Sequence, residues 1–516
     1  MPAARDSTYD LVIAGAGING AGVARDAAGR GLKVLLVEQD DIAAATSQWS
    51  TKLIHGGLRY LEQFEFRLVR ESLAEREVLL HCAPHLVAPL AFVLPHEPHL
   101  RPAWMIRLGL FLYDHLGRRE TLPGSFGVDL AGGKWGAGLK PKFRRGFVYA
   151  DARVDDARLV VQTVMAAREL GADVCTRTRL AAARREGDGS RWRVTLVEAS
   201  GATREVTAKA IVNATGPWVK RVRDSISRSP ASENVRHVKG SHIVVPRVHA
   251  EPHAYILQNA DKRIVFVIPF EDRYSLIGTT DVPVDEFEAP QITRDETLYL
   301  LDLANTYLAT PLTVADIVWS FSGVRPLYDD GASDPSAITR DYVLRIDTGT
   351  AGDDRPAGAP VLSIFGGKLT TYRKLAEHAL AELTPFFPQL GPAWTKERPL
   401  PGGDLPAGGL AAWIEELARR HPALPVELLR GLAHRHGSLA AVILDGAKTS
   451  ADLGEAFGPV LTAAEIDYLV REEWARTADD ILWRRTKCGL AMPASDRERV
   501  AAYVAKAVAA GIAQAA

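Results

Sequence analysis

Three glycines and one acidic residue have the spacing of a dinucleotide-binding loop. Gly15, Gly17 and Gly20 follow the apolar run Leu11–Ala14, and Glu38 ends the next apolar run, 23 positions after the first glycine. The first glycine permits a tight turn, the second lets backbone N–H groups approach a pyrophosphate, and the third lets a helix pack closely on a strand. The carboxylate accepts hydrogen bonds from a ribose. This pattern predicts a dinucleotide cofactor but does not separate NAD from FAD.

Two strands and a helix must position this loop. The alanine-rich residues 18–28 predict a helix, which the glycines at 29 and 31 end. Residues 33–38 (KVLLVE) then predict a second strand, so the order is β, α, β. The N-terminus of such a helix carries the positive end of its dipole and faces the phosphates. The fold class indicated is α/β.

The remaining chain divides into regions of different composition. We expect a helix over 158–170, strands over 191–197 and 205–213, and a sheet over 242–280, where β-branched and aromatic residues gather. Residues 50–120 read as helical and loop-rich. The Pro/Gly-rich stretch 397–409 predicts a linker, and the alanine- and leucine-rich residues after it predict helices. A domain boundary is therefore expected near residue 400.

Composition excludes several classes of protein. The chain has 516 residues, 47% of them hydrophobic and 24% charged, which predicts two or three globular domains and excludes a mostly disordered chain. Its net charge of −1 gives no general attraction to nucleic acid. Cys82, Cys175 and Cys488 are too isolated for a disulfide framework or a metal site, so we expect no metal and a reducing compartment. We also expect no signal peptide and no membrane-spanning helix.

Five longer segments resemble the FAD-dependent glycerol-3-phosphate dehydrogenases, and among these the respiratory, quinone-linked bacterial type. The segments are residues 10–30, 50–62 (STKLIHGGLRYLE), 212–218 (VNATGPW), 320–326 (SFSGVRP) and 365–377 (FGGKLTTYRKLAE). The resemblance implies an α/β FAD-binding fold, of the two-dinucleotide-binding, Rossmann-like type, with an inserted α+β substrate-binding cap and an all-α C-terminal domain. Ala14 and Ala16 stand where family members often have glycine.

The same resemblance implies a division of the chain into two domains. Residues 1–398 would form the FAD-dependent oxidoreductase domain, and residues 399–516 the helical domain. Within the first, the FAD-binding segments would be about 1–70, 150–240 and 325–398, and the cap segments about 71–149 and 240–325.

Residues that contact FAD are implied by the matched motifs. The set is Gly15, Gly17, Gly20, Glu38, Thr51, Lys52, Gly216, Gly366, Gly367, Leu369 and Thr370. The paired glycines let the backbone approach the flavin. The helix that begins near Thr370 points the positive end of its dipole at the ring, which stabilises the anionic reduced form.

The implied substrate is sn-glycerol 3-phosphate, which would be oxidised to dihydroxyacetone phosphate. A phosphate dianion requires local cations, and the motifs supply Arg59 with Tyr60, Arg340 and Lys368 for substrate binding. Three further residues are implied in catalysis, namely His242, Arg325 and His55. Arginine stays protonated, so Arg325 is expected to stabilise a developing alkoxide while a histidine takes the hydroxyl proton.

Electrons must leave the flavin, and the resemblance implies a membrane quinone as acceptor and peripheral attachment to the cytoplasmic face of the membrane. Residues 101–119 mix aromatic and aliphatic side chains with arginines, as interfacial segments do. A stripe over 369–383 is a second candidate for membrane contact or for core packing. A homodimer is also implied. A soluble glycerol-3-phosphate oxidase, an amine or amino-acid oxidase, and a membrane-surface scaffold remain alternatives.

Overall fold

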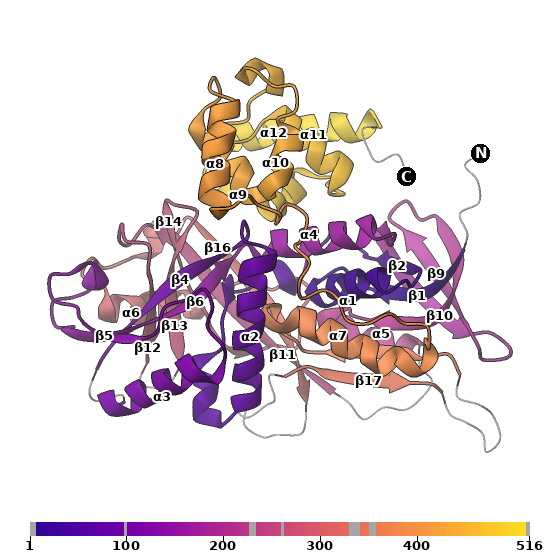
Figure 1. Cartoon of the computed structure of the whole chain (residues 1–516), viewed down its shortest axis with the longest axis horizontal. Helices are drawn as coiled ribbons and strands as arrows, with labels where there is room; N and C mark the ends of the chain where they lie inside the picture. Colours follow the sequence, from indigo (N-terminus) through magenta and orange to yellow (C-terminus); the bar gives the residue numbers. More distant parts are fainter. Residues whose placement is uncertain are drawn as a thin grey trace.

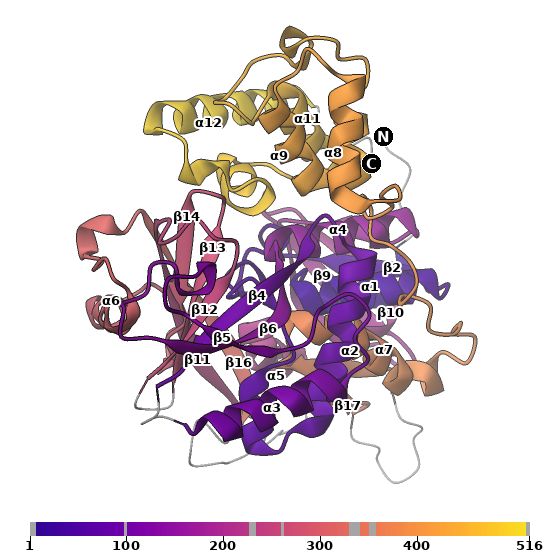
Figure 2. The same cartoon turned by 60° about the vertical axis from the view of Figure 1, so that its left-hand side comes forward.

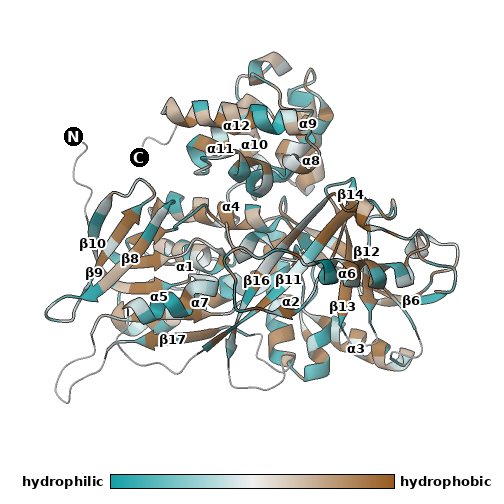
Figure 3. Ribbon diagram, turned by 180° about the vertical axis from the view of Figure 1, so that it is seen from behind, coloured by the Kyte–Doolittle hydropathy of each residue, from teal (hydrophilic) through white to brown (hydrophobic). Residues whose placement is uncertain are grey.

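Two β-sheets lie side by side in the computed structural model, and a group of helices near the C-terminus covers one end of both (Figure 1). The structure describes residues 7–97, 101–226, 234–259, 263–329, 341–349 and 358–511. The predicted residue Arg340 lies outside this part of the chain. Figure 3 shows that strands such as β12 and β13 (bounds below) are mainly hydrophobic.

The first sheet carries the dinucleotide loop. Its strand order is β17-β18-β10-β1-β2-β7, and β9 pairs with both β10 and β8. The strands from β18 to β7 run parallel, which places their carboxyl ends at one edge. Their bounds are β1 Thr8–Ala14, β2 Val34–Val37, β7 Asp173–Cys175, β8 Thr178–Arg185, β9 Trp192–Glu198, β10 Thr203–Asn213, β17 Val343–Asp347 and β18 Val361–Phe365.

Four helices accompany the first sheet. They are α1 Ile18–Gly29, α4 Asp156–Glu169, α5 Val219–Ile226 and α7 Tyr372–Leu383. Helix α1 packs against both α4 and α7. The apolar stripe of α7 is buried in this packing, with Leu375, Leu380 and Leu383 fully covered. The stripe over 369–383 therefore belongs to the core and is not a membrane-contacting face.

The second sheet is mostly antiparallel. Its order is β15-β11-β14-β13-β12-β4-β6-β3, with β16 beside β11 and β5 beside β6. The bounds are β3 Leu53–Ile54, β4 Val87–Pro95, β5 Phe126–Asp129, β6 Arg145–Val154, β11 Asn234–Pro246, β12 Ala254–Gln258, β13 Ile264–Phe270, β14 Tyr274–Gly278, β15 Val282–Pro283 and β16 Trp319–Asp329. Helices α2 Phe66–Cys82, α3 Ala103–Leu116 and α6 Arg294–Tyr307 accompany this sheet.

The C-terminal part of the chain is helical. Helices α8 Gly409–Arg420, α9 Val426–His436, α10 Ala440–Ile443, α11 Ala463–Glu472 and α12 Ala494–Ala509 lie above α4 and β14, on the side of the molecule opposite α3 (Figure 2). A π-helical turn, η10, spans Asp480–Arg485. No helix among the described residues is long and apolar enough to cross a bilayer.

The predicted α/β class with an added sheet and C-terminal helices is confirmed. The expected βαβ unit, the helix near 158–170 and the strands near 191–197 and 205–213 all form. One expectation was wrong. Residues 50–120 are not only helical and loop-rich, because Val87–Pro95 forms the inner strand β4 between β6 and β12. Its prolines hid a nine-residue apolar strand from the pattern.

Candidate functional site

The glycine loop is built so that only glycine fits at two positions. Gly15 has a φ of +101°, in the region that favours glycine, and its N–H donates to the carbonyl of Val37. A Cβ on Gly20 would lie 1.9 Å from the carbonyl oxygen of Gly15. Glu38 follows β2, and its carboxylate accepts hydrogen bonds from the backbone N–H of Ala16 at 2.8 Å and of Asp40 at 3.0 Å. The loop and this carboxylate thus meet at one edge of the sheet.

Two adjoining cavities open beside this loop. One, which we call the glycine-loop cavity, measures about 730 Å³ and is lined by Gly15, Gly17 and Glu38 among others. The other, the cationic cavity, measures about 640 Å³ and lies between the two sheets' segments. The two cavities share six of their lining residues, namely Ile18, Thr46, Ser47, Trp49, Pro326 and Gly367. Together they form one trough, and its glycine-lined part suits the close approach of a dinucleotide pyrophosphate.

A second glycine segment closes the trough from the other side. Gly366 and Gly367 follow β18 with φ angles of +73° and +101°. The Asn19 side-chain amide of α1 donates to the carbonyl of Gly366 at 3.0 Å, while its Oδ1 is buried without a hydrogen-bond partner among the described residues. A Cβ on Gly367 would lie 2.9 Å from Asn19 Nδ2. A polar atom left open at this junction fits a bound cofactor that donates to it.

Most of the predicted residues line the trough. The glycine-loop cavity is lined by Gly15, Gly17, Glu38, Gly216, Gly366 and Gly367. The cationic cavity is lined by Thr51, His55, Arg59, Tyr60, His242, Arg325, Gly367, Lys368, Leu369 and Thr370. Gly20 and Lys52 line neither cavity. Gly20 acts in packing, as its position in the pattern predicts, whereas the Lys52 ammonium is buried and bonded to Asp156 Oδ1 at 2.8 Å.

His242 lies on β11 with its ring almost completely buried. Its Nε2 is 3.1 Å from the Thr51 hydroxyl, and its ring stacks on Phe321 with centroids 4.8 Å apart. Burial, and after it the charges of Lys52 and Arg325, lower the pKa of His242 to about 3. The ring is therefore neutral in the physiological range, and a neutral imidazole can accept a proton.

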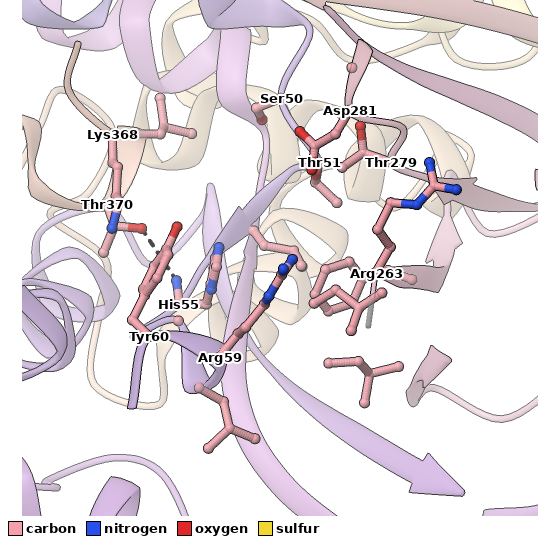
Figure 4. Close-up of a pocket in the computed structure, with 18 of the residues that line it drawn as sticks. Ser50, Thr51, His55, Arg59, Tyr60, Arg263, Thr279, Asp281, Lys368 and Thr370 are labelled. Carbon is pink, nitrogen blue, oxygen red and sulfur yellow. Dashed lines mark hydrogen bonds between the residues drawn. The ribbon is translucent and has the colours of Figure 1, made fainter. Parts of the chain in front are cut away.

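His55 approaches the same cavity from the segment after β3 (Figure 4). Its backbone N–H donates to the Thr370 hydroxyl at 3.3 Å, which joins it to the start of the α7 region. Burial is the main cause that lowers the pKa of this histidine as well. Both predicted histidines are thus neutral side chains at one cavity.

Positive side chains gather in the cationic cavity. Figure 4 shows Arg59 extending into it, and Arg263 also lines it, with its guanidinium 4.1 Å from the centroid of the Tyr299 ring. Lys368 Nζ lies 4.0 Å from the centroid of the Tyr60 ring, a cation–π contact that places the ammonium across the cavity. Arg325 on β16 is held by Asp281 at 2.6 Å and donates to the carbonyl of Thr280 at 3.0 Å. The arrangement suits a small anionic ligand.

Several cavity residues were not predicted from the sequence, among them Trp49, Arg101, Arg263 and Asp281. Arg263 lies in the region 242–280 and Asp281 directly follows it, where the sequence predicted a sheet but no site residue other than His242. Trp49 lines both cavities and precedes the predicted Thr51 by two positions. Arg101, which pairs with Glu62, begins the segment 101–119 that the sequence indicated as interfacial, and it was not predicted as a site residue. Among the described residues no group of three or more His, Cys, Asp or Glu side chains could hold a metal ion.

Known protein families and relatives match this chain over most of its length. The FAD dependent oxidoreductase family matches residues 10–373, and the C-terminal domain of alpha-glycerophosphate oxidase matches residues 393–513. The aerobic glycerol-3-phosphate dehydrogenase of Escherichia coli is 53% identical over 96% of this chain and 97% of that protein. The D-erythritol 1-phosphate dehydrogenase of Brucella abortus is 48% identical over 96% of this chain and 97% of that protein.

A solved structure supports the same assignment. The glycerol-3-phosphate dehydrogenase from Bacillus halodurans, determined in complex with FAD, superimposes with a TM-score of 0.72 at 26% identity and covers 98% of this chain and 95% of that chain. The FAD cofactor that the family resemblance implies is confirmed, and the glycine loop alone had left NAD open. This chain belongs to the FAD-dependent oxidoreductases and, within them, to the glycerol-3-phosphate dehydrogenase family.

Proposed function

We propose that this enzyme oxidises sn-glycerol 3-phosphate to dihydroxyacetone phosphate and that the electrons pass through FAD to a membrane quinone. The observation that carries the proposal is the cationic cavity, which is lined by two neutral histidines and several cations and shares lining residues with the glycine-loop cavity. The Escherichia coli relative is named for activity on the same substrate. When bound, FAD supplies the acceptor for the hydride that leaves C2.

Arg59 and Lys368 are the proposed phosphate ligands. The structure describes no ion pair between Arg59 and a carboxylate, so its guanidinium is available to hold a phosphate through two parallel hydrogen bonds. The ring of Tyr60 holds the Lys368 ammonium across the same cavity. Arg340 stays a candidate for the same role, on the sequence motif alone.

His242 is the proposed general base. Its ring is neutral because it is buried, and the Thr51 hydroxyl at Nε2 fixes its orientation. Arg325 cannot take a proton, and its pairing with Asp281 holds the guanidinium at the cavity wall, where it stabilises negative charge on the substrate oxygen. His55 is the second candidate for the base.

Helix α3 supports attachment to a membrane surface. Trp104, Met105, Leu108 and Phe111 are exposed on this helix, and Phe64 nearby is 78% exposed. Three of these, Phe64, Met105 and Leu108, also line the cationic cavity. An apolar face of this kind inserts into the headgroup region of a bilayer, and here it borders the catalytic cavity. An apolar acceptor such as a quinone would therefore reach the site from the membrane side.

The remaining expectations join this proposal. We place the protein on the cytoplasmic face of the membrane, as a peripheral protein and as a homodimer, with an oxidoreductase domain over 1–398 and a helical domain over 399–516. Co-sedimentation with liposomes, with and without Trp104→Ser and Phe111→Ser, tests attachment. Light scattering in detergent-free buffer tests the dimer.

A second candidate substrate is D-erythritol 1-phosphate, which the name of the Brucella abortus relative favours. Both substrates present a secondary alcohol and a phosphate, so the cations and the base described above would serve either. An oxidase reaction differs only in the electron acceptor. Amine and amino-acid oxidation would leave the cluster of Arg59, Arg325 and Lys368 without a purpose.

The test uses the purified holoprotein under anaerobic conditions. We expect its yellow flavin absorbance to bleach within seconds on addition of glycerol 3-phosphate, and more slowly with erythritol 1-phosphate. The absence of bleaching with any polyol phosphate would overturn the proposed reaction. Steady-state turnover that requires an added quinone analogue supports the dehydrogenase, whereas turnover with oxygen alone would make the protein an oxidase.

A further inference from the structure

The π-helical turn η10 and the two residues that follow it reach from the C-terminal helices to residues that adjoin the lining of the catalytic trough. π-Helical turns are rare and concentrate at functional sites. This turn carries Trp483, Arg484 and Arg485, and Lys487 follows it with its side chain almost completely buried. Charged side chains are buried here in a part of the chain more than 400 residues from the glycine loop. Such burial requires specific partners.

One set of partners lies at the start of the loop that lines the trough. Arg484 and Arg485 both donate to the carboxylate of Asp41, which is itself buried. Arg484 Nε lies 2.6 Å from Asp41 Oδ2, and Arg485 Nη2 lies 2.8 Å from Asp41 Oδ1. Asp41 begins the segment 41–51, which includes Thr46, Ser47 and Trp49 along both cavities. The turn therefore fixes one end of that segment.

A second set of partners lies at the other end of the same segment. Lys487 donates to Asp155, and the neighbouring Asp156 accepts from the Ser50 hydroxyl at 2.7 Å and from the Lys52 ammonium at 2.8 Å. Ser50 and Lys52 flank Thr51, whose hydroxyl contacts His242 Nε2. A polar path thus runs from the C-terminal helices to the catalytic histidine.

Aromatic rings form a separate path to the same histidine. Trp483 stacks on Trp319 of β16, with centroids 5.1 Å apart and planes 20° apart. Trp319 contacts Phe321 at 5.1 Å, and Phe321 stacks on the His242 ring at 4.8 Å. Contacts from η10 and from Lys487 therefore lead to one side chain: the polar contacts end at Nε2 of His242, through Thr51, and the aromatic contacts end at the face of its ring, through Phe321.

We infer that Trp483 and Lys487 are positioning residues that hold the loop 41–52 and, through Thr51 and Phe321, the ring of His242 in the catalytic cavity. This inference rests on the proposed role of His242. It gives the C-terminal helical region a part in the chemistry, since a side chain displaced by about 1 Å can slow a reaction by up to roughly 10²-fold.

The experiment replaces Trp483 by leucine in the full-length holoenzyme. The matched control is Trp413→Leu, because this second tryptophan of the C-terminal helices is buried and donates to the carbonyl of Gly437, which lies outside η10. Two quantities are measured, the limiting rate of anaerobic flavin bleaching per bound flavin and amide hydrogen exchange of the peptide 41–55. We expect Trp483→Leu to lower the rate by about tenfold or more and to speed exchange of that peptide. Trp413→Leu should lower the melting temperature and change neither quantity.

Rescue and a double variant separate positioning from general damage. Trp483→Phe keeps a ring that can stack on Trp319, so its rate should return to within about threefold of the wild type. In a His242→Ala background Trp483→Leu should slow bleaching no further, because the two residues act through one path. Lys487→Gln tests the polar path by the same two measurements. If Trp483→Leu yields no holoprotein, the Lys487→Gln variant alone tests the positioning role.

The outcomes distinguish this inference from the proposed function. A normal rate and normal exchange in Trp483→Leu, or in Lys487→Gln where that variant decides, would overturn the positioning role while a slow His242→Ala keeps the histidine as base. Normal bleaching in His242→Ala would instead remove the proposed base, and the inference with it.

Discussion

Replacement of His242 by alanine should slow flavin reduction by about 10²–10⁴-fold, which corresponds to roughly 3–5 kcal/mol of the activation free energy. The structure gives three reasons why a solvent molecule would replace the ring poorly. The ring is oriented at Nε2 by Thr51, it is held in plane by Phe321, and water has little access to it because the side chain is 2% exposed. A solvent molecule in the cavity left by alanine would lack all three constraints.

The pH dependence follows from the direction of the pKa shift. An ordinary histidine has a pKa of about 6.5, so at pH 5.5 only about a tenth of the molecules would hold the neutral base. Burial and two neighbouring cations lower the pKa of His242 to about 3, so the base remains neutral throughout the range from pH 5.5 to 8. We therefore expect the limiting rate to be nearly constant between these values.

The assay is stopped-flow bleaching of the flavin at saturating glycerol 3-phosphate. The limiting rate is the quantity to follow, because a phosphate ester titrates near pH 6 and would dominate any second-order constant. An acidic limb near pH 6.5 that vanishes in His242→Ala would refute the argument from burial. An unchanged rate in His242→Ala would transfer the role to His55.

Four further predictions address cofactor, substrate, stability and acid sensitivity. Gly17→Val should lower the flavin content measured by absorbance, because the added side chain meets Ser47 Oγ, 3.1 Å from the Cβ position, at the face of the cavity. Lys368→Ala should raise KM for glycerol 3-phosphate by about ten- to a hundredfold, from the loss of roughly 1.5–3 kcal/mol, and leave glycerol oxidation unaffected. Lys52→Met should lower the free energy of unfolding in urea by about 3–5 kcal/mol, because Asp156 keeps a buried charge without its partner. Burial, with smaller effects from nearby cationic groups, lowers the pKa of His85 to about 3. Stability therefore falls as the pH drops from 6.5 toward 3, because the unfolded chain takes up a proton there and the folded chain does not. His85→Leu should reduce the slope of the unfolding free energy against pH by about 1.4 kcal/mol per pH unit, measured in unfolding titrations.

Local patterns predicted the part of the fold that local contacts determine. The glycine spacing and two apolar runs specify the βαβ unit, because the turn, the helix start and the strand pairing involve residues close in sequence. Strand β4 was missed because its burial depends on β12, more than 150 residues away. Its local pattern of prolines and mixed apolar residues did not identify it as an inner strand.

For the site, the sequence predicted which residues take part but not how buried or how charged they are. The motifs indicated His242 and Lys52, but composition and spacing could not show that both are buried. The state of each depends on partners brought by folding, namely Phe321 and Thr51 for the histidine and Asp156 for the lysine. Lys52 was predicted to contact the cofactor, and in the structure it is the buried ion-pair partner of Asp156. Its charge lowers the pKa of His242, after the larger effect of burial.

These states connect the two ends of the chain. The low pKa of His242 depends on a dry, fixed surrounding, and the loop beside it has little regular structure, since residues 49–52 belong to no helix or strand. A loop of this kind holds one conformation only when other elements determine it. The carboxylates of Asp41 and Asp156 hold this loop at its two ends. The cations that pair with Asp41 come from η10. Burying such pairs adds little net stability compared with apolar packing, so their value lies in the geometry that they specify. The proposed base and the C-terminal helices are therefore parts of one arrangement, in which cations of η10 hold the start of the loop beside His242.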